Sequence, residues 1–142
     1  MDPISASGDS RAVALARRVL RIEADAVAAL AERIGEEFEQ ALDIILKRHG
    51  RVIVTGIGKS GHIARKIAAT LASTGTPAYF VHAAEAAHGD LGMITPEDVV
   101  LALSTSGSSA ALLMIVPLVK RQVALQIAMT GKSSTPQALQ AD

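Results

Sequence analysis

The 142-residue sequence contains no cysteine, which excludes disulfides, thiolate nucleophiles and thiolate metal sites. Aromatic side chains are confined to Phe38, Tyr79 and Phe80, so the core must be aliphatic, as it is in layered α/β sheets. Neither sign of charge is in excess, which argues against nucleic acid or an anionic membrane surface as the main partner. The longest apolar run, residues 110–119, is too short to cross a bilayer, and residues 1–5 lack a signal-peptide pattern. We therefore expect a cytoplasmic protein with no membrane segment.

The first third of the chain has the periodicity of one long helix over residues 10–48. Apolar residues there recur at steps of three and four and form a single stripe: Val27, Leu30, Ile34, Phe38, Leu42 and Ile45. Such a helix would be about 58 Å long at roughly 1.5 Å per residue, more than a domain of this size can cover. We therefore expect part of the stripe to pack against another subunit, in a homodimer or homotetramer.

The rest of the chain alternates short strands with helices. Strands are predicted at 52–55, 78–81, 99–103 and 124–129, and helices at 63–73 and 109–122. Each strand is a mainly apolar run without regular alternation, which is typical of strands covered on both faces. The sequence thus predicts a three-layer α/β/α, doubly wound parallel sheet with the flavodoxin-like strand order, in a single domain over 1–142. Residues 137–142 resemble the start of a connection to a further strand, so we expect this domain to stop before its last strand.

Three turns that follow strands combine glycine with hydroxyl side chains. They are Thr55–Gly61, Ser104–Ser109 and Thr130–Thr135. Ligands of open α/β sheets bind beyond the carboxyl ends of the strands, where helix N-termini and backbone N–H groups hold phosphate without a metal. The sequence therefore predicts a phosphate-containing ligand at this edge.

The first of these turns partly matches two known phosphate motifs. It contains the Gly-Lys-Ser that ends a P-loop motif, but Ile53 stands where that motif needs its first glycine. Its G-x-G-x-x-G spacing, Gly56 to Gly61, also fits a dinucleotide fold. Such a fold requires an acidic residue at the end of the second strand, where His82 stands. The hydroxyl-rich turn 104–109 favours a small sugar phosphate instead, and a dinucleotide remains an alternative.

Together, the segments GKSGH, STGTP and EAAHGDLGM closely resemble the sugar isomerase (SIS) domain of bacterial D-arabinose 5-phosphate isomerases. The resemblance runs from about Arg51 to Leu103 and more loosely to Asp142. It implies a five-stranded sheet, a tetramer and interconversion of ribulose 5-phosphate and arabinose 5-phosphate on the route to lipopolysaccharide or capsule. Full-length members usually add two CBS domains, which this sequence does not contain. The resemblance implies no required cofactor.

The resemblance also assigns roles to individual residues. It makes Lys59 and His88 catalytic, where the alternatives are a solvated lysine and a locally hydrogen-bonded histidine. His82 matches a zinc-binding position, but no second ligand stands at metal spacing, which favours a metal-free histidine at a strand end. The expected substrate-binding set is Gly58, Ser60, Gly75, Thr76, His88, Ser104, Thr105, Ser106, Ser108 and Ser109.

Two departures from the family pattern bear on catalysis. Ser108 and Ala111 stand where the family has glutamates, the second of which is a candidate catalytic group. Three hypotheses therefore remain: a pentose-phosphate isomerase, a non-catalytic SIS module that binds a sugar phosphate, and a dinucleotide-binding domain.

Overall fold

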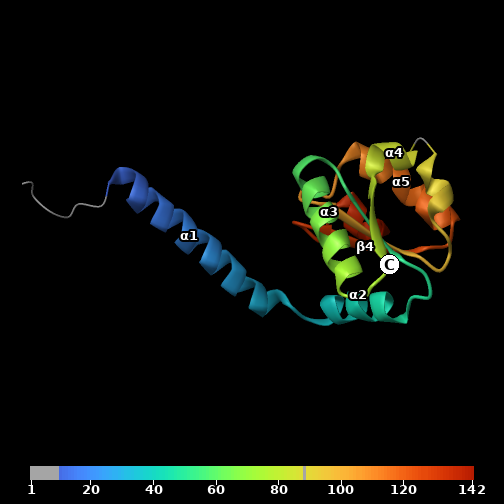
Figure 1. Cartoon of the computed structure of the whole chain (residues 1–142), viewed down its shortest axis with the longest axis horizontal. Coiled ribbons are helices and arrows are strands. Elements are labelled where there is room, and N and C mark those ends of the chain that lie inside the picture. Colours follow the sequence, from blue (N-terminus) through green and yellow to red (C-terminus); the bar gives the residue numbers. More distant parts are fainter. Residues whose placement is uncertain (1–9, 88) are drawn as a thin grey trace, which may run out of the picture. The chain divides into compact units, whose positions relative to one another are not determined.

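The structure is a computed structural model that describes residues 10–87 and 89–142. The chain separates into two compact units, Met1–Glu39 and Gln40–Asp142. The described part of the first unit holds helix α1 (Arg11–Leu30), a 3-10 turn η1 (Ala31–Arg33) and the start of helix α2 (Glu36–Lys47), which continues into the second unit (Figure 1). No helix in the described residues is both long enough and apolar enough to cross a membrane.

The predicted long N-terminal helix is present as α1, but its predicted continuation as one helix over residues 10–48 is wrong. The helical backbone ends in η1, and Ile34 takes an extended conformation before α2 begins. Gly35 favours the break because glycine is costly inside a helix. The three glutamates that follow stabilise a new N-terminus through the helix dipole: Glu36, Glu37 and Glu39. The apolar stripe is therefore divided at Ile34.

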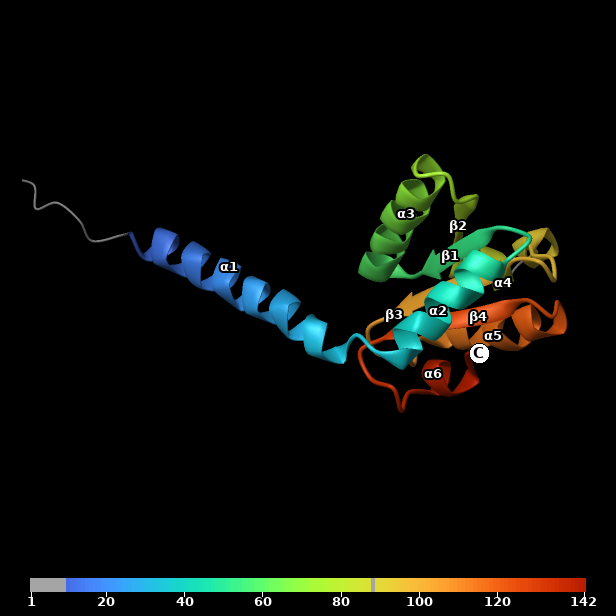
Figure 2. The ribbon, with the colours of Figure 1, turned by 90° about the horizontal axis from the view of Figure 1, so that it is seen from below.

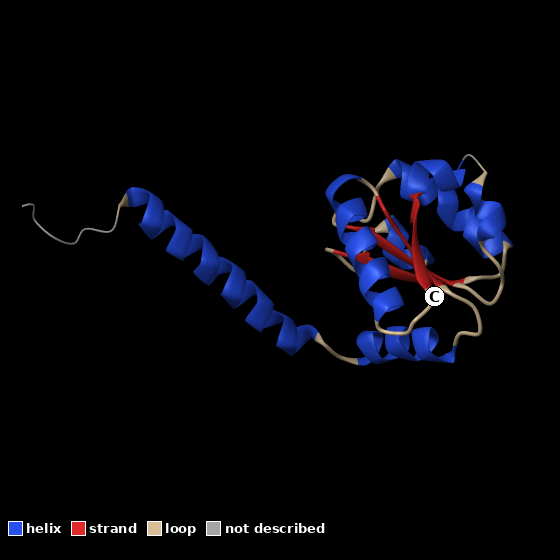
Figure 3. Ribbon diagram, viewed as in Figure 1, coloured by secondary structure: helices blue, strands red, loops and turns tan. Residues whose placement is uncertain are grey.

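The second unit is built on a four-stranded parallel sheet (Figure 3). Its strands are β1 (Val52–Gly56), β2 (Ala78–His82), β3 (Val99–Ser104) and β4 (Leu125–Thr130). They lie in the order β2-β1-β3-β4, which confirms the predicted flavodoxin-like arrangement. Because β1 lies between β2 and β3, the strand order reverses at the gap between β1 and β3. The carboxyl ends of these two strands meet there, and Gly56 pairs with Leu103.

Helices cover both faces of the sheet, as the mainly apolar strands predicted (Figure 2). On one face, α3 (Gly58–Ser73) contributes Ala64 and Ala68 to a cluster with β1 and β3, and Ile45 packs against it. On the other face, α4 (Ala83–Ala87) and α5 (Ala110–Arg121) enclose a second cluster. A short 3-10 turn η2 (Asp90–Met93) precedes β3, and α6 (Pro136–Gln140) contacts α5 and β4. The predicted helix 109–122 is confirmed, whereas α3 begins five residues before the predicted 63–73.

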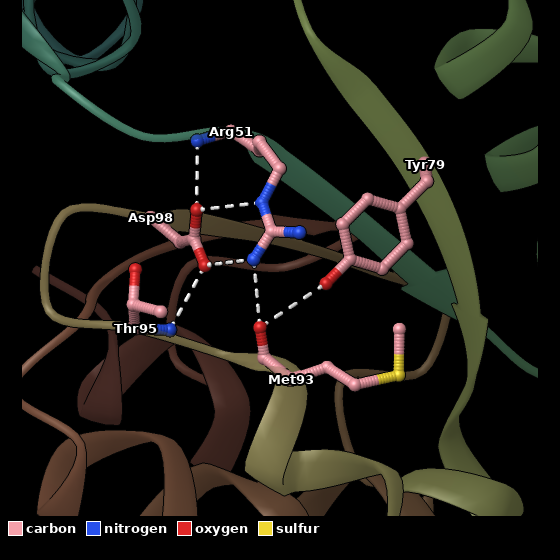
Figure 4. A network of polar contacts seen from close by, with 5 residues as sticks. All are labelled: Arg51, Tyr79, Met93, Thr95 and Asp98. Carbon is pink, nitrogen blue, oxygen red and sulfur yellow. Dashed lines mark hydrogen bonds and ion pairs between the residues drawn. The ribbon is translucent and has the colours of Figure 1, made fainter.

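A polar network ties the sheet together at the amino ends of its strands (Figure 4). Asp98, which is buried, accepts hydrogen bonds from the backbone N–H groups of Arg51 (2.7 Å) and Thr95 (2.9 Å). The Arg51 guanidinium donates to Asp98 and to the carbonyl of Met93 (2.7 Å), and it lies 5.0 Å from the centre of the Tyr79 ring. Burial raises the pKa of Tyr79 above its ordinary value, although the charge of Arg51 opposes the shift. The network thus fastens the end of the sheet opposite the candidate site.

Candidate functional site

Two adjoining hollows open at the carboxyl edge of the sheet, where β1 and β3 end. One, of about 290 Å³, lies toward α5, and the other, of about 310 Å³, lies toward α3 and β4. They share Ser60, Leu103, Ser104 and Thr105. Each volume is near the lower end of the range of roughly 300–1,000 Å³ typical of small-molecule sites. A ligand of a few carbon atoms with a phosphate group therefore suits the site better than a dinucleotide.

The turn from β1 into α3 brings the backbone close to this edge. Gly56 and Gly61 are in close contact, since a β-carbon on Gly61 would lie only 3.0 Å from the Gly56 carbonyl oxygen. The absence of side chains at these two positions allows the start of α3 to pack closely against the end of β1. Gly58 has a φ of +58°, a conformation that residues with a β-carbon rarely adopt. Lys59 and Ser60 follow in the first turn of α3, where backbone N–H groups lack helical partners and the helix dipole favours an anion. The G-x-G-x-x-G spacing thus has a local structural cause that requires no dinucleotide.

The turn from β3 into α5 is held by its own hydroxyl groups. The N–H of Gly107 donates to the hydroxyl of Ser104 (3.1 Å), and the N–H of Ser108 donates to the hydroxyl of Ser106 (3.3 Å). Ser109 is the N-cap of α5, yet its side chain makes no capping hydrogen bond. Its hydroxyl is therefore available to a ligand, beside the positive end of a twelve-residue helix.

Five of the ten predicted substrate-binding residues, and the predicted catalytic residue Lys59, line the two hollows. The five binding residues are Ser60, Ser104, Thr105, Ser106 and Ser109. Gly58 and Ser108 belong to the same two turns but do not line either hollow. His88 lies outside the described residues, so its predicted role stays a prediction.

Gly75 and Thr76 lie at the other end of the sheet. Both follow the C-terminus of α3 and precede β2, and the N–H of Thr76 donates to the carbonyl of Leu71 (2.9 Å). Since the hollows open beyond the carboxyl ends of the strands, these two residues cannot reach a ligand bound there in the same chain. A role in substrate binding would require a second copy of the protein.

His82 ends β2 beside Gly56, at the carboxyl edge but outside both hollows. Its Nδ1 accepts a hydrogen bond from the N–H of Ala84 (3.2 Å), so Nε2 is the atom left for another partner. Residues 10–87 and 89–142 contain no group of three histidine, aspartate or glutamate side chains placed to hold a metal ion. Among the described residues, His82 is therefore not part of a three-ligand group that could hold zinc.

Sequence reasoning missed the apolar side of the site. Ile57 and Leu112 line the first hollow, and Ile63 and Met129 line the second. Thr130 and Gly131 also line it; they belong to the third glycine–hydroxyl turn, which the sequence predicted at this edge. No aspartate or glutamate is present among the described residues that line the two hollows.

Comparison with known proteins identifies relatives whose sequences match most of this chain. Residues 44–142 match the family model described as the SIS domain. Arabinose 5-phosphate isomerase KdsD of Pseudomonas aeruginosa is 55% identical over 127 residues, which cover 89% of this chain and 39% of the relative. Arabinose 5-phosphate isomerase GutQ of Escherichia coli K12 is 53% identical over 125 residues, with 88% and 39% covered. The chain therefore spans 39% of the length of these curated relatives.

Comparison with solved structures identifies a protein of similar fold. A structure of an Escherichia coli CFT073 protein in complex with arabinose 5-phosphate matches with a TM-score of 0.90 and 38% sequence identity. The match covers 96% of this chain and 72% of that chain. The predicted sheet architecture and the resemblance to sugar isomerase domains are thus confirmed.

Proposed function

Because the chain belongs to the SIS domain family, we propose that it binds arabinose 5-phosphate and ribulose 5-phosphate and is the domain that interconverts them. The observation that carries this proposal is the meeting of two glycine–hydroxyl turns around one small hollow at the β1/β3 switch point. The arabinose 5-phosphate isomerase names of the curated relatives, and the neighbouring structure with arabinose 5-phosphate bound, support the choice of a pentose phosphate.

We assign the phosphate to the turn Ser104–Ser109. The hydroxyls of Ser104, Ser106 and Ser109 and the N-terminus of α5 would hold it without a metal. The sugar would then extend toward the first turn of α3, where Lys59 lines the second hollow. The ammonium group of Lys59 would stabilise the negative charge that develops on the substrate oxygens.

The reaction requires that a proton move between C1 and C2 of the sugar. A base removes the C1 proton of ribulose 5-phosphate, the enediolate forms, and a proton is returned to C2 to give the aldose. We assign acid–base work to His88, on the resemblance alone. Because the isomerisation oxidises one carbon as it reduces its neighbour, we propose that no cofactor is required. Zinc at His82 remains an optional addition.

The second candidate is a non-catalytic module that binds the same sugar phosphate. Ser108 and Ala111 in place of the family's glutamates favour it, as does the lack of a carboxylate among the described lining residues. Loss of a general base typically costs about 10²–10⁴ in rate, whereas a phosphate site built of hydroxyls and amides is unaffected. We therefore expect this chain to bind its substrate but to convert it slowly.

Calorimetric titration with arabinose 5-phosphate, paired with a turnover assay, separates these functions. Binding of arabinose 5-phosphate but not of arabinose supports the phosphate assignment, and absence of both contradicts it. Binding with turnover supports the isomerase, and binding alone supports the module. In the second case Ala111→Glu should raise turnover, whereas the neighbouring Ala110→Glu, with the same added charge, should not.

We further propose that copies of this chain associate through α1, as a homodimer or homotetramer, in the cytoplasm. The helix has an apolar half with residues seven apart, Val13, Leu20 and Val27, and none of its residues is buried. A role in the supply of a lipopolysaccharide or capsule sugar would follow from the proposed substrate.

A further inference from the structure

We propose that Gln137 is a positioning residue that holds the Ser104–Ser109 turn in its ligand-binding shape. The inference rests on the proposed function, because it assigns a support to the turn that would hold the phosphate. Gln137 lies in α6, outside both hollows, and would act only through the backbone of the turn.

Gln137 is joined to the turn and to the strand before it. Its side chain is buried (the residue is 2% exposed), and Nε2 donates to the carbonyl of Ala102 (2.9 Å), two residues before Ser104. Its backbone N–H donates to the carbonyl of Gly107 (3.0 Å), in the middle of the turn. One residue therefore fixes the distance between the end of β3 and the point where the turn reverses.

Two residues shortly before Gln137 in the sequence, Gly131 and Thr135, contact the same turn. The N–H of Gly131 donates to the carbonyl of Thr105 (3.1 Å). Thr135 packs so closely on Gly107 that a β-carbon there would overlap its side chain. The segment 131–137 thus contacts the turn at positions 105 and 107 while Gln137 also holds position 102. The hydroxyls of Ser104 and Ser106, which would meet the phosphate, lie between these fixed points.

The chemistry of the side chain favours this role over simple core filling. Oε1 of Gln137 is buried with no hydrogen-bond partner in the described structure, which is unfavourable for the fold. Methionine has a similar length and would fill the same space without burying an amide. What methionine cannot do is donate to Ala102, so the specific contribution of the amide is the placement of the backbone that leads into the turn.

A second buried glutamine provides a matched control. Gln126 in β4 is 4% exposed, and its Nε2 donates to the carbonyl of Val116 (3.1 Å), away from the two hollows. The variants Gln137→Met and Gln126→Met each remove one buried hydrogen bond from an amide to a backbone carbonyl. A purely structural role predicts similar losses of stability and equal ligand binding for both variants.

The test measures arabinose 5-phosphate binding by calorimetry and amide hydrogen exchange at residues 105–108, for the full chain and both variants. We expect Gln137→Met to weaken binding at least about tenfold, or ~1.4 kcal/mol. Exchange at Gly107 should be faster in this variant even without ligand, whereas Gln126→Met should leave both quantities unchanged.

Equal binding and equal Gly107 exchange in the two variants would overturn the positioning role. If the unmodified chain bound no arabinose 5-phosphate, the proposed function would fail. The exchange rates of the ligand-free proteins would still decide whether Gln137 holds the turn.

Discussion

Arg51 and Asp98 form a two-pronged ion pair that joins the residue before β1 to the residue before β3. Nη2 of Arg51 lies 3.0 Å from Oδ2 of Asp98, and Nε lies 3.2 Å from Oδ1. Burial of Asp98 by itself raises its pKa. Hydrogen bonds from the Arg51 side chain and from the N–H groups of Thr95 and Arg51 outweigh burial, so the pKa of Asp98 is below its ordinary value. The folded state therefore favours the charged carboxylate.

This lowered pKa predicts a defined pH dependence of stability. An Asp that is more acidic in the folded state stabilises it above its unfolded pKa of about 3.9, and the contribution is lost as the pH falls through the folded value. Asp98→Asn should lower the free energy of unfolding by about 1.5–3 kcal/mol at pH 7. The difference from the unmodified chain should shrink below about pH 4, as measured by urea denaturation between pH 3 and 7.

The exposed pair of Asp43 and Lys47 is the control for this measurement. Its side chains are 2.7 Å apart but lie mostly in solvent. Asp43→Asn should change the free energy of unfolding by less than about 1 kcal/mol, because exposed ion pairs contribute little. An equal loss in both variants, or a constant Asp98→Asn effect down to pH 3, would contradict the account of Asp98.

Gly107 in the candidate phosphate turn should not tolerate alanine. Its φ of +62° disfavours a β-carbon, and that β-carbon would also overlap Thr135. Gly107→Ala should cost about 3 kcal/mol of stability and also weaken phosphate binding. Gly58→Ala is the control, because Gly58 has nearly the same φ with open space around it, so the cost should be about 1 kcal/mol. Thermal and urea unfolding of both variants measure the difference, and equal losses would mean that Thr135 does not restrict position 107.

Most of the fold was predictable because its signals are local. Strands β1 to β4 are mainly apolar runs, and each observed end differs from the predicted one by a single residue at most. The point where the first helix ends was not predictable from periodicity. The apolar spacing continues through Ile34, although the backbone at Ile34 is extended. A glycine followed by three glutamates was the available signal for the break at Gly35.

The polar half of the candidate site was also predictable, since hydroxyls and glycines after parallel strands converge on one edge. Its apolar half was not, because nothing in the spacing of Ile63 and Met129 distinguishes a wall of a hollow from surface or core. The role of Gln137 could not be foreseen either. Its contacts with Ala102 and Gly107 join positions 30 or more residues apart in sequence, which only the folded chain brings together.

If copies of the chain associate through α1, charge on its apolar half should separate them. Leu20→Glu and Val27→Glu together place two carboxylates among exposed apolar side chains of the helix. We expect sedimentation analysis at micromolar concentration to show an oligomer for the unmodified chain and a folded monomer for the double variant. A well-folded monomer of the unmodified chain would contradict the proposed association.

The dinucleotide hypothesis predicts that the chain binds NAD(H), which the residues at the site do not favour. His82 occupies the end of β2, where an acidic residue would hold the adenosine ribose. We therefore expect no NAD(H) affinity in the micromolar range by calorimetry. Micromolar binding, displaced by arabinose 5-phosphate, would restore the dinucleotide hypothesis.

The most direct test of the central claim is to map arabinose 5-phosphate onto the backbone of the isotopically labelled chain by NMR. The account predicts that the largest shifts fall on the amides of Ser104–Ser109 and of Gly58, Lys59 and Ser60, and that inorganic phosphate reproduces those of Ser104–Ser109 alone. Shifts centred on the opposite end of the sheet, around Arg51, Thr76 and Asp98, or no shifts at millimolar ligand, would contradict it.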